Sequence, residues 1–165
     1  ANAQGELGDG TSTRRTLPTV IASSVSTAKA GGRHTLFRKT NTSLMACGSN
    51  DSGQLGGYYS SSVLIPLAMV GTNASSIAAG GRHTFYIRSD GTLWGTGSNI
   101  SGQLGVGSTG YYRYSLGQVA GTYSAVAAGG SHSLFLRTDS TAWSTGSNEY
   151  GQLGNGTLAY RATPV

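Results

Sequence analysis

The three histidines of this chain are the side chains best suited to acid–base or metal chemistry, and they recur at one spacing. His34, His83 and His132 each follow a Gly-Gly pair, and each lies 49 residues after the last. Zinc holds its histidine nitrogens at ~2.0–2.1 Å, whereas equivalent positions of a long repeat lie a whole repeat apart. The spacing therefore predicts buried scaffold histidines that bond backbone carbonyls, with no metal site and no unique catalytic base.

A second motif, Gly-Gln-Leu-Gly, returns with the same period. Its copies begin at Gly53, Gly102 and Gly151, and a variant with Glu in place of Gln begins at Gly5. A phosphate-binding loop would lead from such glycines into a helix N-terminus, and no helical pattern follows here. The motif therefore predicts tight turns, in which the Gln side chains bond the backbone.

The segments between these motifs are short apolar runs separated by turn residues. Each unit has an apolar step before the Gly-Gly pair, a strand after it, a turn such as Asp90-Gly91, and a closing strand. Asp-Gly is a strong hairpin signal, and no window shows helical periodicity. We expect one repeat array over residues 1–165, with units at about 2–49, 50–98 and 99–147 and a partial unit at 148–165.

The complete unit, with an Ala-Gly-Gly-x-His block and a Gly-Ser-Asn-x-x-Gly-Gln-Leu-Gly block, resembles the repeat of the regulator of chromosome condensation (RCC1) family. Glu6, Met45 and Ser115 depart from the pattern. The resemblance implies an all-β fold of RCC1-like β-propeller blades, with three complete repeats plus a shared end segment. The family typically has seven blades, which implies a larger ring or assembly. It also implies a nucleotide-exchange or chromatin-binding role, for which no residue can be matched.

Composition narrows the function classes further. The 165 residues carry a net charge of +5 with 10% charged residues, which permits nucleic-acid binding without favouring it. Cys47 is the one cysteine, so no intrachain disulfide can form, and no apolar run reaches the ~20 residues that span a bilayer. Nothing indicates a cofactor. Low charge, few lysines and abundant Ser, Thr and Tyr favour an extracellular or cell-surface setting.

The number of units predicts an unfinished ring. Three units are fewer than the four blades of the smallest common propellers. We expect a fragment or ordered part of a longer repeat chain, and the alternative is assembly of several chains into a ring or filament. An open arc would expose an apolar face, which favours association.

The variable segments after each Gly-Gln-Leu-Gly motif carry the least repetitive chemistry. They are rich in Tyr and Arg, which give contact area and hydrogen bonds at recognition surfaces. The candidate partner-binding residues are Tyr58, Tyr59, Tyr111, Tyr112, Arg113, Tyr114, Tyr160 and Arg161. Two interpretations stay open, because loop tyrosines can bind a partner or cover the neighbouring blade.

One further position is basic in every repeat, at Lys39, Arg88 and Arg137. Asn41, Asp90 and Asp139 follow two residues later, so we expect local pairing across the turn rather than a binding rim.

The sequence as a whole indicates a non-enzymatic protein-interaction or scaffold module, because no nucleophile–base constellation stands out from the repeats. The alternatives are a building block of a filament, surface appendage or other assembly, and the exchange or chromatin role of the family.

Overall fold

The computed structural model describes residues 1–57, 60–69 and 73–165, and every regular element in them is a β-strand. The strands are β1 (Val25–Ala30), β2 (His34–Lys39), β3 (Leu44–Ser49), β4 (Ser62–Ala68), β5 (Ala74–Ala79), β6 (His83–Arg88), β7 (Thr92–Asn99), β8 (Gly110–Ala128), β9 (His132–Arg137) and β10 (Ala142–Gly146). Within the described ranges no helix is long and apolar enough to cross a membrane. The predicted all-β class is confirmed.

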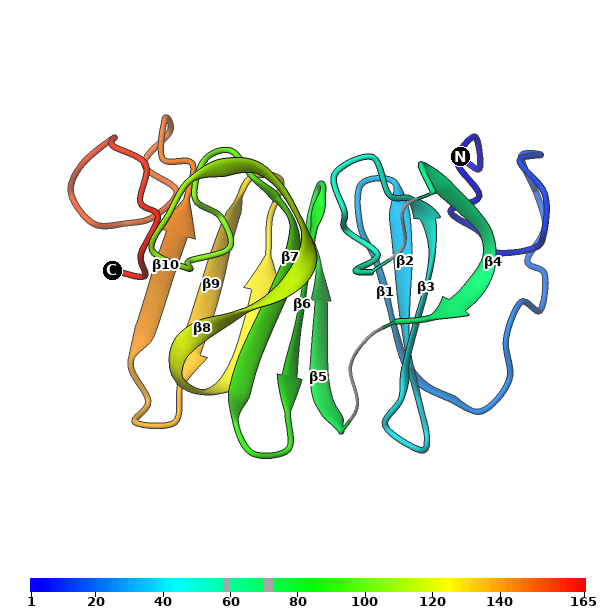
Figure 1. Cartoon of the computed structure of the whole chain (residues 1–165), viewed down its shortest axis with the longest axis horizontal. Coiled ribbons are helices and arrows are strands. Elements are labelled where there is room, and N and C mark those ends of the chain that lie inside the picture. The colour runs from blue at the N-terminus through cyan, green and yellow to red at the C-terminus, as the bar shows by residue number, and fades with distance from the viewer. Residues whose placement is uncertain (58–59, 70–72) are drawn as a thin grey trace.

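The strands form three antiparallel blades that follow one another along the chain (Figure 1). The first blade is the meander β1-β2-β3-β4. The next six strands form one continuous sheet, because β8 is shared: its first part pairs with β7, and its part from Tyr123 to Ala128 pairs with β9. The second blade is therefore β5-β6-β7 with the first part of β8, and the third blade is the last part of β8 with β9 and β10.

Residues at the C-terminal end complete the third blade. Arg161 forms an antiparallel bridge with Gly146, and Ser144 and Val165 exchange backbone hydrogen bonds of 2.9 and 3.0 Å. The segment from 161 to 165 thus takes the place that β4 holds in the first blade. All three blades have four strand positions, as propeller blades do.

The hairpins at the lower end of Figure 1 depend on side chains that bond their own turn. Asp90 Oδ1 accepts hydrogen bonds from the backbone N–H of Thr92 at 2.9 Å and from its hydroxyl at 2.6 Å. These bonds favour the ionised carboxylate and lower the pKa of Asp90. Gly91 takes the positive φ, +81°, that the Asp-Gly signal predicts.

The hydrophobic core lies between blades rather than inside one. One cluster joins the first blade to the second, and its largest member is Tyr86. The other joins the second blade to the third around Phe85 and Phe135, whose rings meet edge to face with centroids 5.4 Å apart. Each blade therefore depends on its neighbours to bury its apolar faces, as in other repeat proteins.

Blades and sequence units are offset from each other. Strands β1, β2 and β3 come from the predicted unit 2–49, whereas β4 comes from the unit that begins at residue 50. The second and third blades repeat this offset, since their fourth strands follow the next Gly-Gln-Leu-Gly motif. The Gly-Gln-Leu-Gly motifs at Gly53, Gly102 and Gly151 therefore lie between the third and fourth strands of their blades.

One part of the expected layout is wrong. The segment Tyr111–Tyr114, which the sequence places in a variable loop, lies in β8, where Tyr112 and Arg113 pair with Ser98 and Gly97. As the outermost strand of its blade, this part of β8 has a partner strand on one side only. Residues 110–112 and 114–115 are all exposed, so this segment lacks the apolar alternation that marks half-buried strands.

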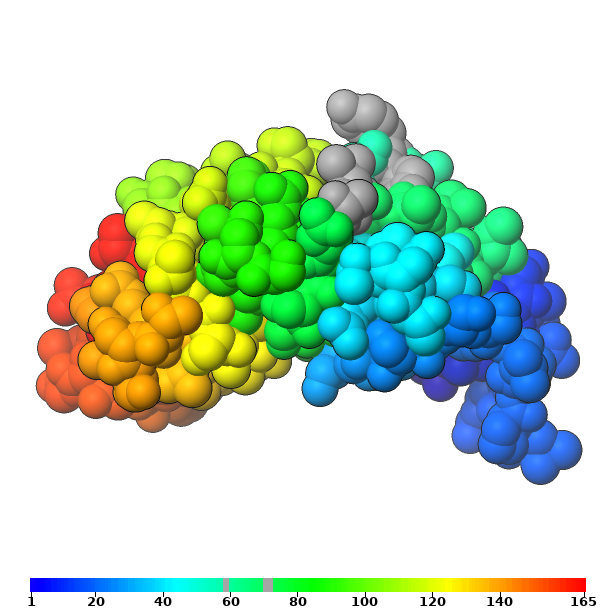
Figure 2. Space-filling view, turned by 90° about the horizontal axis from the view of Figure 1, so that it is seen from below, coloured from blue at the N-terminus to red at the C-terminus, as the bar shows by residue number. Residues whose placement is uncertain are grey.

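Seen along the strands, the molecule has an arched outline (Figure 2). Three blades side by side make an arc, and the arrangement is an incomplete propeller.

Candidate protein-interaction surface

The repeated histidines are joints between blades. His34 Nε2 lies 2.9 Å from the hydroxyl oxygen of Thr84 in the next blade, and His83 Nε2 lies 3.0 Å from that of Ser133. The Ser133 hydroxyl itself donates to the carbonyl oxygen of Gln103 at 2.7 Å, so His83 donates through Nε2. The expected bonds to backbone carbonyls are therefore replaced by bonds to hydroxyls across the interface.

Burial keeps these two rings neutral. It lowers the pKa of His34 to about 4 and, with the nearby His34 and His132 as smaller causes, that of His83 to about 3. Across the described residues no group of three or more His, Cys, Asp or Glu side chains could hold a metal ion. The geometry assigns His34 and His83 to the scaffold.

The Gly-Gly pairs form the second joint. The N–H of Gly32 donates to the carbonyl oxygen of Gly80, and that of Gly81 to Gly129, each at 3.0 Å. A Cβ atom on Gly81 would lie 2.5 Å from the carbonyl oxygen of Gly130. Glycine is needed here because the backbones of neighbouring blades touch.

The Gly-Gln-Leu-Gly turns form the third joint. Each turn approaches the fourth strand of the next blade so closely that a Cβ on its first glycine would touch backbone: Gly5 meets Leu64, Gly53 meets Tyr114 and Gly102 meets Ala162. The glutamines stiffen the turns as predicted, since Gln103 Oε1 accepts from the N–H of Ser101 at 3.0 Å.

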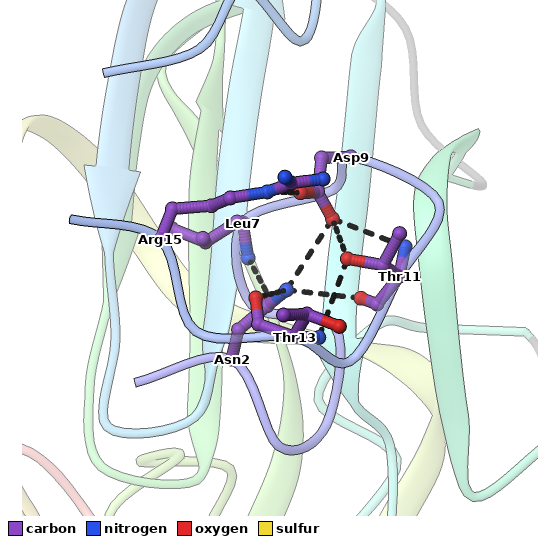
Figure 3. A network of polar contacts seen from close by, with 6 residues as sticks. All are labelled: Asn2, Leu7, Asp9, Thr11, Thr13 and Arg15. Atoms are coloured by element: carbon purple, nitrogen blue, oxygen red, sulfur yellow. Dashed lines mark hydrogen bonds and ion pairs between the residues drawn. The ribbon is translucent and has the colours of Figure 1, made fainter. Parts of the chain in front are cut away.

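An asparagine organises the loop around each of these turns. Figure 3 shows the first copy, in which Asn2 Nδ2 donates to the carbonyl oxygens of Thr11 and Thr13, both at 2.9 Å, while Asn2 Oδ1 accepts from Leu7 N–H. Asp9 completes this network with a 2.7 Å ion pair to Arg15, which holds the pKa of Asp9 well below its usual range. This first loop is thus an ordered part of the scaffold.

The contacts between blades end at the outward side of the third blade, which has no neighbouring blade among the described residues. Within the described chain, a Cβ on Gly130 or on Gly154 would meet nothing within 4 Å, in contrast to the equivalent glycines of earlier repeats. Leu134 is 46% exposed, whereas Phe85 at the same repeat position is fully buried. The outward side of this blade, with Leu134, Leu136 and Ala142, is an open apolar face.

Four of the predicted partner-binding tyrosines are exposed, and one of them, Tyr114 at 40%, also contacts the neighbouring blade. Tyr111, Tyr112 and Tyr160 are 80%, 42% and 61% accessible, and the rings of Tyr111 and Tyr112 stand edge to face at 6.4 Å. Arg161 is also exposed. Tyr112 and Tyr160 each precede the arginine that pairs with the last glycine of its blade, Gly97 or Gly146, so they are equivalent.

The remaining predicted residues either contact the protein itself or lie outside the described ranges. Tyr114 covers the neighbouring blade, because its hydroxyl donates to the carbonyl oxygen of Asp51 at 3.3 Å. The guanidinium of Arg113 lies over Gly117, where a Cβ would come within 2.7 Å of its Nε. Tyr58 and Tyr59 lie outside the described residues. Tyr114 therefore contacts the neighbouring blade, and partner binding by the exposed tyrosines stays a prediction.

Ile100 belongs with the exposed tyrosines, although the sequence analysis did not select it. It is 53% exposed and shares a shallow hollow with Thr109 and Tyr111. The signal was present in the repeat alignment, where the same position is Asp51 in one copy and Glu149 in another. The first copy has Ala3 at this position, so Ile100 is the one large apolar side chain there, and it adds exposed apolar surface beside Tyr111.

The predicted pairing of Arg88 and Arg137 across their turns is not found in the described residues, where the one ion pair joins Arg15 to Asp9. Instead, the guanidinium of Arg88 lies 4.7 Å from the ring centre of Trp94, and that of Arg137 lies 3.9 Å from that of Trp143. Cation–π contact holds these arginines against their blades.

Four-stranded blades that pack face to face, and are held by histidine, glycine and turn contacts, define a β-propeller, of which three blades are described. The family profile of the Regulator of chromosome condensation (RCC1) repeat matches residues 74–103 and 123–152. These two stretches carry RCC1-type repeats, as the sequence resemblance predicts. A comparison with curated protein sequences found no match.

Solved structures show the same fold. Yeast RCC1 (Prp20) bound to Kap60 matches with a TM-score of 0.78 and 21% identity over 86% of this chain and 36% of that chain. Prp20p from Saccharomyces cerevisiae gives 0.80 and 21%, over 86% and 38%. Human WBSCR16 gives 0.75 and 25%, over 86% and 39%. The chain therefore spans little more than a third of the length of the structures it matches.

Proposed function

We propose that this chain is a non-enzymatic protein-interaction module, and that it binds its partner through the exposed tyrosines beside the fourth strands. The observation that carries the proposal is the cluster of Tyr111, Tyr112 and Ile100 on ordered backbone at the rim of the second blade. Tyr160 repeats the feature on the third blade.

Physical chemistry supports a protein partner. Tyrosine offers large contact area with little loss of side-chain freedom, and exposed aromatic side chains are enriched in the centres of protein interfaces. The supporting strand is held by the ladder to β7, so binding would order little backbone. The related yeast protein has been solved with Kap60 bound and studied for binding to Gsp1p and histones, which are all proteins.

An exchange-factor or chromatin-binding role rests on analogy with proteins of which this chain covers about a third. No described residue favours it over the interaction role, and fold alone does not transfer function.

The test is affinity capture with the intact chain and its Tyr111→Ser/Tyr112→Ser variant. Leu17→Ser is the matched control, because Leu17 is about as exposed as Tyr111 but lies in the N-terminal segment. Partners captured by the wild type and the control should be lost with the tyrosine variant while its unfolding free energy is unchanged. Equal capture by all three proteins would refute the proposal.

A second candidate, a building block of an assembly, is favoured by the open face of the third blade. A further RCC1-type blade would cover Leu134 and Leu136 and give Gly130 a backbone partner. A second copy could not add its first blade in the same way. The turn at Gly151 of the first copy would have to contact β4 of the second copy, and that strand already contacts the turn at Gly5 of its own chain. Light scattering at micromolar concentration tests this function: a monomer with the same mass as its Leu136→Glu variant would exclude self-assembly.

A further inference from the structure

A polar groove of about 290 Å³ crosses the blades at the end where β2, β6 and β9 begin. Its floor is the row of Gly-Gly pairs, through Gly32, Gly81 and Gly130, and its sides include Arg33, Arg82, Ser98 and Gln103. The exposed tyrosines of the second blade do not line it. The scaffold contacts described above explain the glycines but leave the two arginines without a role.

Arg33 and Arg82 occupy one repeat position on successive blades, and both side chains are exposed. Their backbones are fixed, because the carbonyl oxygen of Arg33 accepts from Ser49 N–H and that of Arg82 from Ser98 N–H, each at 2.8 Å. Neither guanidinium has an ion pair or hydrogen bond to another described residue. The two positive charges therefore stand side by side on rigid supports with nothing to neutralise them.

The side of the groove also offers a hydroxyl group, that of Ser98, as a hydrogen-bond donor. In the first blade the Ser49 hydroxyl donates to the carboxylate of Asp51 at 3.2 Å. In the second blade Ile100 replaces that aspartate, and the Ser98 hydroxyl accepts from Gln103 Nε2 at 3.1 Å without an acceptor for its own proton among the described residues. Ser98 is thus free to donate to a ligand.

No described acidic residue lines the groove, and the chain has a net charge of +5. We propose that this groove binds an acidic peptide segment of a partner protein, with Arg33 and Arg82 each holding one carboxylate and Ser98 donating to the second. The planar guanidinium fork matches a carboxylate, and arginine clusters recognise acidic motifs in this way. Two anchors on successive blades suit an extended chain, whereas a lone phosphate needs donors that converge on one point. No aromatic side chain lines the groove for stacking on a nucleobase.

The experiment measures fluorescence anisotropy of a labelled hexaglutamate peptide against the intact chain, with hexaglutamine as the uncharged control. Because charge-assisted hydrogen bonds carry such contacts, Arg33→Ala or Arg82→Ala should weaken binding about five-fold, and the double variant at least about twenty-fold. Arg14→Ala is the matched control, since Arg14 is exposed but lies outside the groove, and should change binding less than about two-fold.

Two further variants sharpen the test. Ser98→Ala should weaken peptide binding about three-fold, a loss that general charge attraction would not produce. The double charge reversal Arg33→Glu/Arg82→Glu should abolish hexaglutamate binding and create binding of hexalysine. Unchanged urea unfolding of each variant excludes a folding defect, because both arginine side chains are exposed.

Several results would overturn the proposal. One is the absence of hexaglutamate binding at about 50 mM salt, where such contacts are only weakly screened. Another is a loss of affinity with Arg14→Ala as large as that with Arg33→Ala or Arg82→Ala. Tighter binding of oligothymidylate or inorganic phosphate that depends on Arg33 and Arg82 would assign the groove to a different ligand. The Tyr111→Ser/Tyr112→Ser variant should bind hexaglutamate normally, so failure of the tyrosine surface and failure of this groove are distinguishable.

Discussion

Acid should destabilise this protein through its two buried histidines, in a pH range where its carboxylates are still ionised. His34 and His83 are almost fully buried, and burial lowers their pKa values to about 4 and about 3. The unfolded chain has the ordinary histidine pKa of 6.5. Below that pH the unfolded state therefore binds more protons than the folded state, and the free energy of unfolding falls as pH falls.

The magnitude follows from the two shifts. Between pH 7 and pH 5 each histidine should remove about 2 kcal/mol, or about 4 kcal/mol together, at about 1.4 kcal/mol per pH unit below 6.5. That loss is large against the ~5–15 kcal/mol of a typical domain. Asp9, Asp90 and Asp139 have lowered pKa values, so their contribution is lost only below their ordinary value of 3.8.

Urea unfolding at pH 7 and pH 5 measures this directly. His83→Gln should reduce stability at pH 7 by about 1–3 kcal/mol, because it removes the bond to Ser133, and should halve the loss between pH 7 and pH 5. His132→Gln is the matched control at the same repeat position, where the ring has no hydrogen bond to another described residue, and it should change stability at pH 7 by less than about 0.5 kcal/mol. A wild-type loss below about 1 kcal/mol, or an undiminished loss in His83→Gln, would refute this reasoning.

Other expected outcomes concern the joints and the open face. Gly81→Ala should cost more than about 2 kcal/mol of unfolding free energy, because its Cβ would lie 2.5 Å from a carbonyl oxygen, whereas Gly130→Ala should cost less than about 0.5 kcal/mol in the same urea assay. Asn99→Ala should cost about 1–3 kcal/mol, since its side chain bonds two backbone groups of the loop, and equal stability would contradict that role. Leu134→Ser/Leu136→Ser should leave the melting temperature nearly unchanged and reduce binding of a hydrophobic dye, and unchanged dye binding would count against an open apolar face.

The sequence predicts the scaffold well, because its period places like residues at like positions. The inner strands, the hairpin at Asp90-Gly91 and the turn role of the glutamines are all present. What a repeat alignment cannot supply is the partner of a residue in the next blade. His34 bonds Thr84, 50 residues further on, and only the packing of blades brings the two together.

The candidate site was harder to predict for a related reason. The strand segment that carries Tyr111 and Tyr112 is exposed at successive residues, so it lacks the alternating pattern by which half-buried strands are recognised. Arg88 was expected to pair with Asp90 on its own turn, but antiparallel pairing of β6 with β7 places it against Trp94. In both cases the cross-strand neighbour, which is not visible in the local sequence, decides the outcome.

The third joint explains why the variable residues gather on the fourth strands. Each Gly-Gln-Leu-Gly turn touches backbone atoms of the strand that receives it, and the side chains at the receiving position are Leu64, Tyr114 and Ala162. Because the contact is made to backbone, the turn places little demand on side-chain identity there. The histidine and Gly-Gly joints depend on particular residues and leave no such freedom. Tyr112 and Tyr160 lie two residues before the receiving residues Tyr114 and Ala162. They therefore lie on strands whose side chains can change without loss of the contacts between blades. Recognition can diverge between copies of the repeat on these strands.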